Sequence, residues 1–334
     1  MLKFCFAPFL LICFHSTPVL AGPDFSVFSL KLQQKLEGRP AFQGSVLLRQ
    51  GDQVLWQYHK GEQQGRSFNQ HSSFFVGSIS KTLAATLVMQ QVQAGKLDLQ
   101  APVSRYLPDL KQQWASTVRV ADLLSHSSGL IDMDTQQNYG QFRYNNLNFQ
   151  LLGQILTAVT KRPYAELAQQ LLQRCKMVDT GFTAKADTVR QGWNEEQGQL
   201  KAVTGFMPEQ AQPSGGLISS VTDVAALPYC MQQQLSKTSL QQMTTPYVQR
   251  QHRWGQVYYG YGVQITQTAA GQEWSHGGYI PGYVSAFHYF PQYQLSLVVL
   301  ENQSMDAADL ARATYYHDQI RDSVIQILSQ QPKD

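Results

Sequence analysis

Cysteine is scarce in this 334-residue chain, which has four, and no two of them form a C-x-x-C pair. The chain also lacks an H-E-x-x-H sequence, so the two common patterns of a zinc site are both missing. No G-x-G-x-x-G run typical of dinucleotide binding occurs either. We therefore expect neither a metal nor an organic cofactor.

Charge is also sparse, because only 15% of the residues are Asp, Glu, Lys or Arg. The formal net charge is +3, and no long run of one sign occurs. The sequence thus has no basic patch typical of nucleic-acid or membrane-surface binding. Hydrophobic residues make up 43% of the chain, which is enough for a sizeable core and argues against disorder.

The one apolar stretch that stands apart is at the N-terminus. Lys3 is followed by the apolar run Phe4–Phe14, and Ala21 offers a small residue at a plausible cleavage point. An uncleaved anchor is the alternative, but the run is shorter than the roughly 18 residues of a spanning helix. We expect a signal peptide over residues 1–21 and an exported protein, periplasmic or secreted, with no membrane span afterwards.

Two cysteines remain once such a signal is removed, Cys175 and Cys230. Export would make a disulfide between them chemically possible, since the compartments outside the cytosol are oxidising. The sequence does not decide whether their geometry permits it.

The order of the predicted elements suggests the architecture. Helices are expected over Asp24–Leu36, Thr82–Ala94, Val118–Leu124, Asn148–Thr160, Tyr164–Cys175, Ser219–Gln234 and about Ala307–Leu328. Strands are expected over Phe42–Gln50, Val54–His59, Gly260–Thr268, Glu273–His276, Val284–Phe290 and Gln294–Leu300, while Gln191–Gln212 is polar and rich in turn residues. Strands thus cluster at both ends and helices in the middle. We predict a single α/β domain over residues 22–334, with one lobe from about 22–95 and 205–334 and an inserted helical lobe over about 96–204.

The most informative segment is Ser78-Ile79-Ser80-Lys81, an S-x-x-K at the start of a predicted helix. Residues i and i+3 share a helix face, so Lys81 can reach Ser78. Burial would disfavour the ammonium form of the lysine, and a neutral lysine can take the proton of a serine nucleophile. The alternative is that Ser78 only caps the helix.

Two further segments carry side chains suited to the same chemistry. Tyr144 and Asn146 precede a predicted helix; a tyrosine beside a lysine ammonium loses its proton more easily, and an asparagine amide can bind a substrate amide. Their alternative is a buried tyrosine and a helix cap. His276-Gly277-Gly278-Tyr279 ends a predicted strand, where glycines let a substrate backbone approach a strand edge. Alone, His276 could be an ordinary strand histidine.

His126 offers a competing arrangement, because Asp132 and Asp134 follow it and a Ser-His-Asp triad can be imagined. The chain has no G-x-S-x-G elbow of the kind that such triads often use. We therefore favour a structural role for His126.

Taken in order, S-x-x-K, Y-x-N and H-G-G resemble the serine hydrolase family of class C β-lactamases, D,D-peptidases and related esterases. The resemblance runs from about Phe42 to Leu300 and implies a mostly antiparallel sheet flanked by helices. It implies that Ser78 is acylated, that Lys81 and Tyr144 manage its proton, and that the backbone N–H groups of Ser78 and Tyr279 form an oxyanion hole. It further implies substrate-binding roles for Asn146, His276, Gly277, Gly278 and Tyr279.

The chain departs from the class C pattern at the third motif, where His276 and Gly277 replace a lysine and a hydroxyl residue. Both replacements weaken recognition of a β-lactam carboxylate. The segment 129–144 is also shorter than in most relatives, which should open the site. We expect hydrolysis of an amide or ester in a small-molecule or peptide substrate, with peptidoglycan-derived peptides among the candidates. A β-lactamase and a non-catalytic relative that binds cell-wall fragments or a partner are the alternatives. The sequence indicates no oligomeric state.

Overall fold

The computed structural model describes residues 32–34, 36–37, 42–183, 189–204 and 207–331. The signal peptide expected over residues 1–21, and most of the helix expected over Asp24–Leu36, lie outside these ranges. Within them, no helix combines the length and apolar character needed to cross a membrane.

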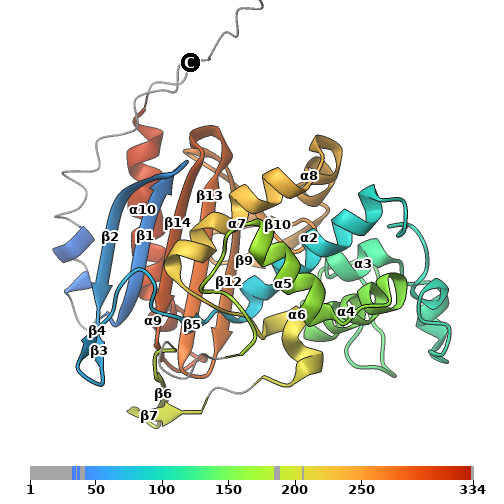
Figure 1. Ribbon diagram of the computed structural model, residues 1–334, viewed down its shortest axis with the longest axis horizontal. Coiled ribbons are helices and arrows are strands. Elements are labelled where there is room, and N and C mark those ends of the chain that lie inside the picture. Colours follow the sequence, from blue (N-terminus) through green and yellow to red (C-terminus); the bar gives the residue numbers. More distant parts are fainter. Residues whose placement is uncertain (1–31, 35, 38–41, 184–188, 205–206, 332–334) are drawn as a thin grey trace, which may run out of the picture.

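An eight-stranded antiparallel sheet forms one side of the molecule, with strand order β2-β1-β14-β13-β12-β11-β10-β9 (Figure 1). Its strands are β1 (Gly44–Gln50), β2 (Gln53–Lys60), β9 (Val248–His252), β10 (Gly255–Tyr259), β11 (Gln264–Thr268), β12 (Gly271–Ile280), β13 (Tyr283–Phe290) and β14 (Leu295–Glu301). The first strands of the chain pair with the last, since Gly44 lies opposite Glu301. The prediction of a mostly antiparallel sheet built from both ends of the chain is confirmed.

Helices cover the sheet and extend beyond it into the part of the molecule on the right of Figure 1. They are α2 (Ser80–Gln93), α3 (Val120–Leu124), α4 (Asn146–Thr160), α5 (Tyr164–Arg174), α6 (Gln212–Gly215), α7 (Val221–Gln234), α8 (Lys237–Met243), α9 (Leu310–Ala313) and α10 (Tyr315–Ser329). The 3₁₀ turns include η1 (Gly77–Ile79), η2 (Val103–Arg105), η3 (Gln113–Ser116), η4 (Glu209–Ala211) and η5 (Pro291–Tyr293).

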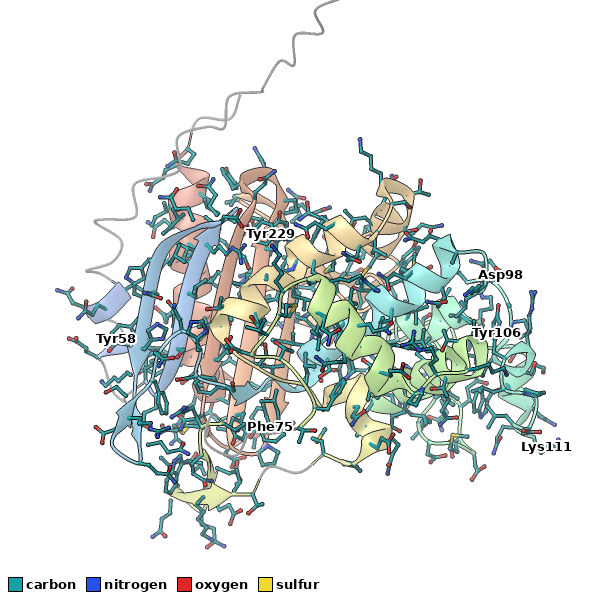
Figure 2. The ribbon with its side chains drawn as sticks, in the orientation of Figure 1. Tyr58, Phe75, Asp98, Tyr106, Lys111 and Tyr229 are labelled. Atoms are coloured by element: carbon teal, nitrogen blue, oxygen red, sulfur yellow. A yellow bond between two sulfur atoms is a disulfide. The ribbon has the colours of Figure 1, made fainter. Side chains whose placement is uncertain are left out.

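Two apolar cores lie on opposite faces of the sheet. Leu297 and Val299 of β14 belong to the core that α10 closes, whereas Val298 and Leu300 belong to the larger core shared with α2 and α7. This alternation follows from the period of two residues in a strand. Because both faces are covered, β13 and β14 are buried along their whole length. Figure 2 shows side chains filling the space between the sheet and the helices, with Phe75 labelled.

The prediction of turns alone over Gln191–Gln212 is wrong in part. The structure has a hairpin there, β6 (Gly192–Glu196) with β7 (Gln199–Val203), and a short strand β15 (Gln303–Ser304) runs parallel to β6. Most residues of both hairpin strands are exposed or half-buried, so they lack the apolar alternation that signals a strand. The last helix likewise begins later than expected, as α9 followed by α10.

A disulfide joins Cys175, which ends α5, to Cys230 within α7, with their Cα atoms 5.4 Å apart. The sequence left this pairing open. The bond fastens a helix of the inserted segment to a helix that packs against the sheet.

Candidate active site

The S-x-x-K segment forms a tight turn that is held in place from several sides. Ser80 Oγ donates to the Gly77 carbonyl at 2.7 Å and accepts from the Leu217 N–H at 3.0 Å. Val76 N–H donates to the Leu217 carbonyl at 3.0 Å. Ser78 lies between these anchors, half-buried at the start of α2, and its side chain caps neither η1 nor α2. The helix-cap alternative for Ser78 is therefore wrong.

Two glycines let this turn approach strand β12 closely. Gly77 has φ +50°, and a β-carbon on it would lie 3.4 Å from the Tyr279 backbone nitrogen. A β-carbon on Gly278 would lie 2.2 Å from the Val76 carbonyl oxygen and 3.0 Å from the Ser78 nitrogen. Any larger residue at 278 would push the strand and the turn apart. The glycines thus bring the backbone N–H groups of Ser78 and Tyr279 to the same place.

Lys81 is completely buried, and its Nζ lies among three oxygen atoms. It is 2.9 Å from Ser78 Oγ, 2.8 Å from Asn146 Oδ1 and 2.5 Å from the Ser214 carbonyl oxygen. Burial lowers the pKa of Lys81 well below the usual lysine value, as predicted. Since an amide oxygen and a carbonyl oxygen can only accept, the two N–H groups of a neutral amine satisfy both, and its lone pair is left for the Ser78 proton.

Tyr144 is 40% exposed and lies at the mouth of the site. Its ring centre is 4.8 Å from Lys81 Nζ, and its hydroxyl interacts with the Ser78 side chain. Loss of water around that hydroxyl raises the pKa of Tyr144 to about 12, although the bond with Ser78 and the charge of Arg250 oppose the shift. This shift is opposite in direction to the one expected of a tyrosine beside a lysine ammonium. At neutral pH it carries a proton that it can donate.

Asn146 is the first residue of α4, two positions earlier than the predicted helix start. The preceding Asn145 caps this helix, because its Oδ1 accepts from the Leu147 N–H at 2.9 Å. Asn146 itself does not cap the helix. It is exposed, and its Oδ1 accepts a hydrogen bond from Lys81 Nζ.

His276 lies on β12 with both ring nitrogens engaged. Its Nδ1 donates to the Gly277 carbonyl and its Nε2 accepts from the Tyr259 hydroxyl, each at 2.7 Å. Burial, with the charge of Arg250 adding to it, lowers the pKa of His276 to about 3. The imidazole is therefore neutral and carries no charge for a substrate carboxylate. Ser275 is the last residue of β12 that pairs with β11. Among the described strands, residues 276–280 pair only with β13.

His126 is fully buried, with φ +58°. Its Nδ1 accepts from Asn148 Nδ2 at 3.0 Å, so it faces an amide rather than a carboxylate. Its ring lies 4.4 Å from that of Tyr144 and 5.0 Å from that of Tyr259. These contacts agree with the structural role that the sequence favoured, and no Ser-His-Asp triad forms around it.

Arg250 is the residue that sequence reasoning missed. It lies on β9, half-buried, with its guanidinium 5.1 Å from the centre of the Phe142 ring. Its Nη1 donates to Gln264 Oε1 at 2.9 Å, and its charge acts on the pKa values of both Tyr144 and His276. No motif surrounds it in the sequence. Only the pairing of β9 with β10 places this cation beside the site.

A family model described as Beta-lactamase matches residues 32–321. The chain therefore belongs to the beta-lactamase family of serine hydrolases, as the ordered motifs predicted.

The individual relatives share low sequence identity with this chain. A protein named Putative penicillin-binding protein PbpX of Bacillus subtilis is 24% identical over 87% of this chain and 76% of its own length. A Beta-lactamase of Providencia stuartii is 31% identical over 46% of this chain, which spans about half (47%) of that protein. Among solved structures, a D-amino acid amidase of Ochrobactrum anthropi in complex with D-phenylalanine has a TM-score of 0.78 at 19% identity, covering 90% of this chain and 100% of that one. This last likeness supports the fold.

Proposed function

We propose that this protein cleaves an amide or ester bond next to a D-amino acid through an acyl-enzyme on Ser78. The observation that supports the acyl-enzyme is the position of the Lys81 amine, which is fully buried and 2.9 Å from Ser78 Oγ. Its other two neighbours, Asn146 Oδ1 and the Ser214 carbonyl oxygen, are both hydrogen-bond acceptors. This arrangement gives the serine a neutral base at the pH where an ordinary lysine would be charged.

In the first half-reaction, Ser78 Oγ attacks the substrate carbonyl carbon while its proton passes to Lys81 Nζ. The carbonyl oxygen becomes an oxyanion, and the N–H groups of Ser78 and Tyr279 donate to it. Tyr144 lends its proton to the leaving nitrogen or oxygen and recovers one from the protonated Lys81 through a water molecule. The C–N or C–O bond then breaks. In the second half-reaction water attacks the ester, and the same groups return Ser78 to its starting state.

Two features favour a D-amino acid substrate over a β-lactam. Neutral His276 and the hydrogen side chain of Gly277 offer nothing to the β-lactam carboxylate, as the sequence suggested. The extension of β12 past β11 supplies a strand edge for an extended peptide or amide. The D-amino acid amidase named above is consistent with this class. Arg250, on β9 rather than on β12, is a cation near Tyr144 and His276 for a carboxylate that lies farther along an extended substrate.

We also propose that the protein is exported. The N-terminal signal pattern and the Cys175–Cys230 disulfide both support a location outside the cytosol, where such bonds persist.

A labelling experiment tests the nucleophile. The mature protein is treated with a fluorophosphonate, and intact mass is compared with that of Ser78→Ala and of Ser116→Ala, which alters an exposed serine of η3. We expect one adduct in the wild type and in Ser116→Ala and none in Ser78→Ala. Absence of an adduct in the wild type would leave a non-catalytic, binding role as the better interpretation.

A substrate panel then separates the reaction types. p-Nitrophenyl esters, D-phenylalanine amide, a D-Ala-D-Ala peptide and nitrocefin are compared, with Ser78→Ala as the blank. We expect turnover of the amide, peptide or ester to exceed that of nitrocefin. Rapid nitrocefin turnover lost in Ser78→Ala would instead identify a β-lactamase.

A further inference from the structure

Ser80 is the second serine of the S-x-x-K segment, and the reaction proposed above gives it no role. It is completely buried at the start of α2. Its Oγ donates to the Gly77 carbonyl at 2.7 Å and accepts from the Leu217 N–H at 3.0 Å. A serine hydroxyl has one proton to donate and an N–H can only donate, so the direction of both hydrogen bonds is fixed.

The Gly77 carbonyl belongs to the same peptide group as the Ser78 N–H, which is one of the two donors assigned to the oxyanion hole. Resonance couples the oxygen and the nitrogen of a peptide group. A hydrogen bond that draws electron density toward the Gly77 oxygen therefore makes the Ser78 N–H a stronger donor. The Leu217 N–H, the Ser80 hydroxyl and the Gly77–Ser78 peptide thus form a chain of aligned dipoles, in which each hydrogen bond strengthens the next.

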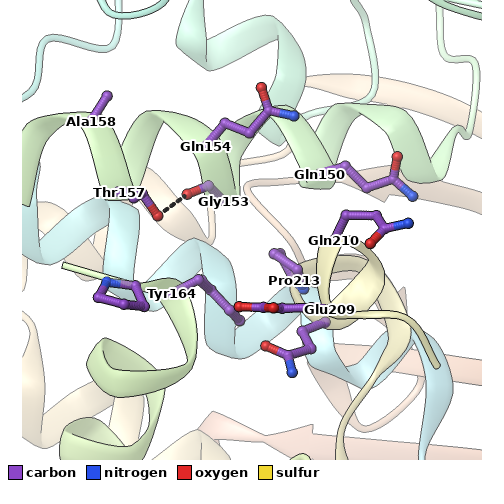
Figure 3. A pocket seen from close by; sticks show the side chains of 11 residues that line it. Gln150, Gly153, Gln154, Thr157, Ala158, Tyr164, Glu209, Gln210 and Pro213 are labelled. Atoms are coloured by element: carbon purple, nitrogen blue, oxygen red, sulfur yellow. Dashed lines mark hydrogen bonds between the residues drawn. The ribbon is translucent and has the colours of Figure 1, made fainter. Parts of the chain in front are cut away.

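The first donor of this chain is held in place by the packing of α6. Leu217 lies two residues beyond the end of α6, and its carbonyl accepts from the Val76 N–H at 3.0 Å. Pro213 of α6 and Gly153 of α4 both line the cavity drawn in Figure 3, and a β-carbon on Gly153 would lie 2.4 Å from Pro213 Cγ. Contacts on both sides therefore fix the Leu217 N–H relative to Ser80.

The peptide of the other oxyanion-hole donor, Tyr279, is placed differently. Its carbonyl oxygen, that of Gly278, lies 3.5 Å from Ser285 Oγ. The same hydroxyl lies 2.8 Å from the Val76 carbonyl, and the shorter distance is the stronger hydrogen bond. The one proton of Ser285 therefore goes to Val76. Of these two buried hydroxyls, only that of Ser80 acts directly on a peptide group of the oxyanion hole.

We propose that Ser80 is a positioning residue of the acyl-transfer site, which holds and polarises the Gly77–Ser78 peptide so that the Ser78 N–H stabilises the oxyanion. The inference rests on the proposed function, because it needs an oxyanion formed at Ser78. The alternative is that Ser80 only fastens α2 to the Leu217 segment. The two roles differ in effect, because polarisation of the donor acts on the transition state, where the charge develops, and leaves substrate binding unchanged.

The test compares Ser80→Ala with the wild type on two p-nitrophenyl esters, one with a C=O and one with a C=S acyl group. Removal of a whole oxyanion donor costs about 10²- to 10³-fold in kcat. Here the Ser78 N–H remains, and the Ser80 backbone N–H still donates to the Gly77 carbonyl. We therefore expect kcat on the C=O ester to fall about tenfold, with KM changed less than about twofold. Sulfur is a weaker acceptor, so the loss on the C=S ester should be less than about threefold.

Two further variants serve as controls. Ser80→Thr keeps a hydroxyl and should recover most of the lost kcat. Thr82→Val removes another buried hydroxyl of α2, which donates to the Gly262 carbonyl at 2.7 Å, and should leave the ratio of the two ester rates as in the wild type. If circular dichroism shows that Ser80→Ala does not fold, Ser80→Cys takes its place, because a thiol is similar in size and only a weak donor.

Equal losses on the two esters, or a folded Ser80→Ala protein with the kcat of the wild type, would overturn the inference and leave the acyl-enzyme standing. A wild-type protein that takes no fluorophosphonate label and turns over neither ester would refute the acyl-enzyme, and the inference would fall with it.

Discussion

Two basic side chains lie at the candidate active site, and they differ in burial and in protonation. Lys81 is completely buried in α2 with three oxygen neighbours around its amine. Arg250 is half-buried on β9, with a Gln264 amide oxygen and the face of Phe142 as neighbours. Burial lowers the pKa of both groups, but an arginine stays protonated while a lysine can become neutral.

This difference in protonation assigns proton transfer to one residue and binding of a substrate charge to the other. We propose that the environment of Lys81 makes it a base for Ser78, whereas Arg250 remains a fixed charge near Tyr144 and His276. The positive charge for a substrate thus comes from β9, while the strand closest to Ser78 supplies only a neutral histidine. Substitutions that exchange these properties should separate the two roles.

The largest effect is expected for Lys81→Arg, because a guanidinium cannot accept the Ser78 proton. We expect kcat on a p-nitrophenyl ester to fall about 10³- to 10⁴-fold. Lys111→Arg, at an exposed position, is the matched control and should leave kcat unchanged. A Lys81→Arg protein that retains most of its activity would rule out Lys81 as the base.

Tyr144→Phe should have the next largest effect, because it removes the hydroxyl and keeps the ring. The pKa of that hydroxyl is raised to about 12, so it carries the proton that we expect it to donate. We expect kcat to fall about 10²-fold for a poor leaving group such as an amide. The loss should be smaller for p-nitrophenolate, which needs no proton to leave. Equal losses on both substrates would contradict the role of proton donor.

The pH dependence of labelling should report the Lys81 pKa. Its lowered pKa means that the amine is neutral above that value and is protonated as the pH falls through it. Labelling of Ser78 should therefore slow about tenfold per pH unit below this pKa. The unfolded chain already binds this proton below the ordinary lysine pKa, so stability falls as the pH drops from that value to the lowered pKa of Lys81 and levels off below it. A labelling rate that increases toward acid pH would contradict this assignment.

Arg250→Gln should lower kcat/KM about tenfold for a peptide that ends in a carboxylate, because a charge-assisted bond is lost. Turnover of a neutral p-nitrophenyl ester should change less than about twofold under the same substitution. Arg250→Lys, which keeps the charge, should recover part of the loss. If turnover of the ester and of the peptide falls equally, Arg250 stabilises the structure of the site and does not bind the substrate carboxylate.

The smallest effect on activity is expected for the double substitution Cys175→Ser and Cys230→Ser, which lies away from both basic side chains. The closed loop spans 55 positions, so the free energy of unfolding should fall by about 3–4 kcal/mol. Denaturant unfolding measures this change, and kcat at 25 °C should stay within about twofold. A large loss of kcat would mean that the α5–α7 link positions the site.

Much of the fold was predictable because its strongest signals are local. The hairpin of β1 and β2 follows from two apolar runs around Gly51-Asp52, and α2 ends just before Gly95, whose φ is +69°. The β6–β7 hairpin was missed because its strands are mostly exposed.

The sequence by itself determined the pair that we propose to react. Ser78 and Lys81 are one helical turn apart, so their contact is a local consequence of α2. Only the tertiary structure decided what surrounds them. The lowered pKa of Lys81 depends on burial, the raised pKa of Tyr144 depends on the loss of water around its hydroxyl, and the placement of Arg250 depends on strand pairing. These properties arise from contacts between residues far apart in the chain, which no short motif records.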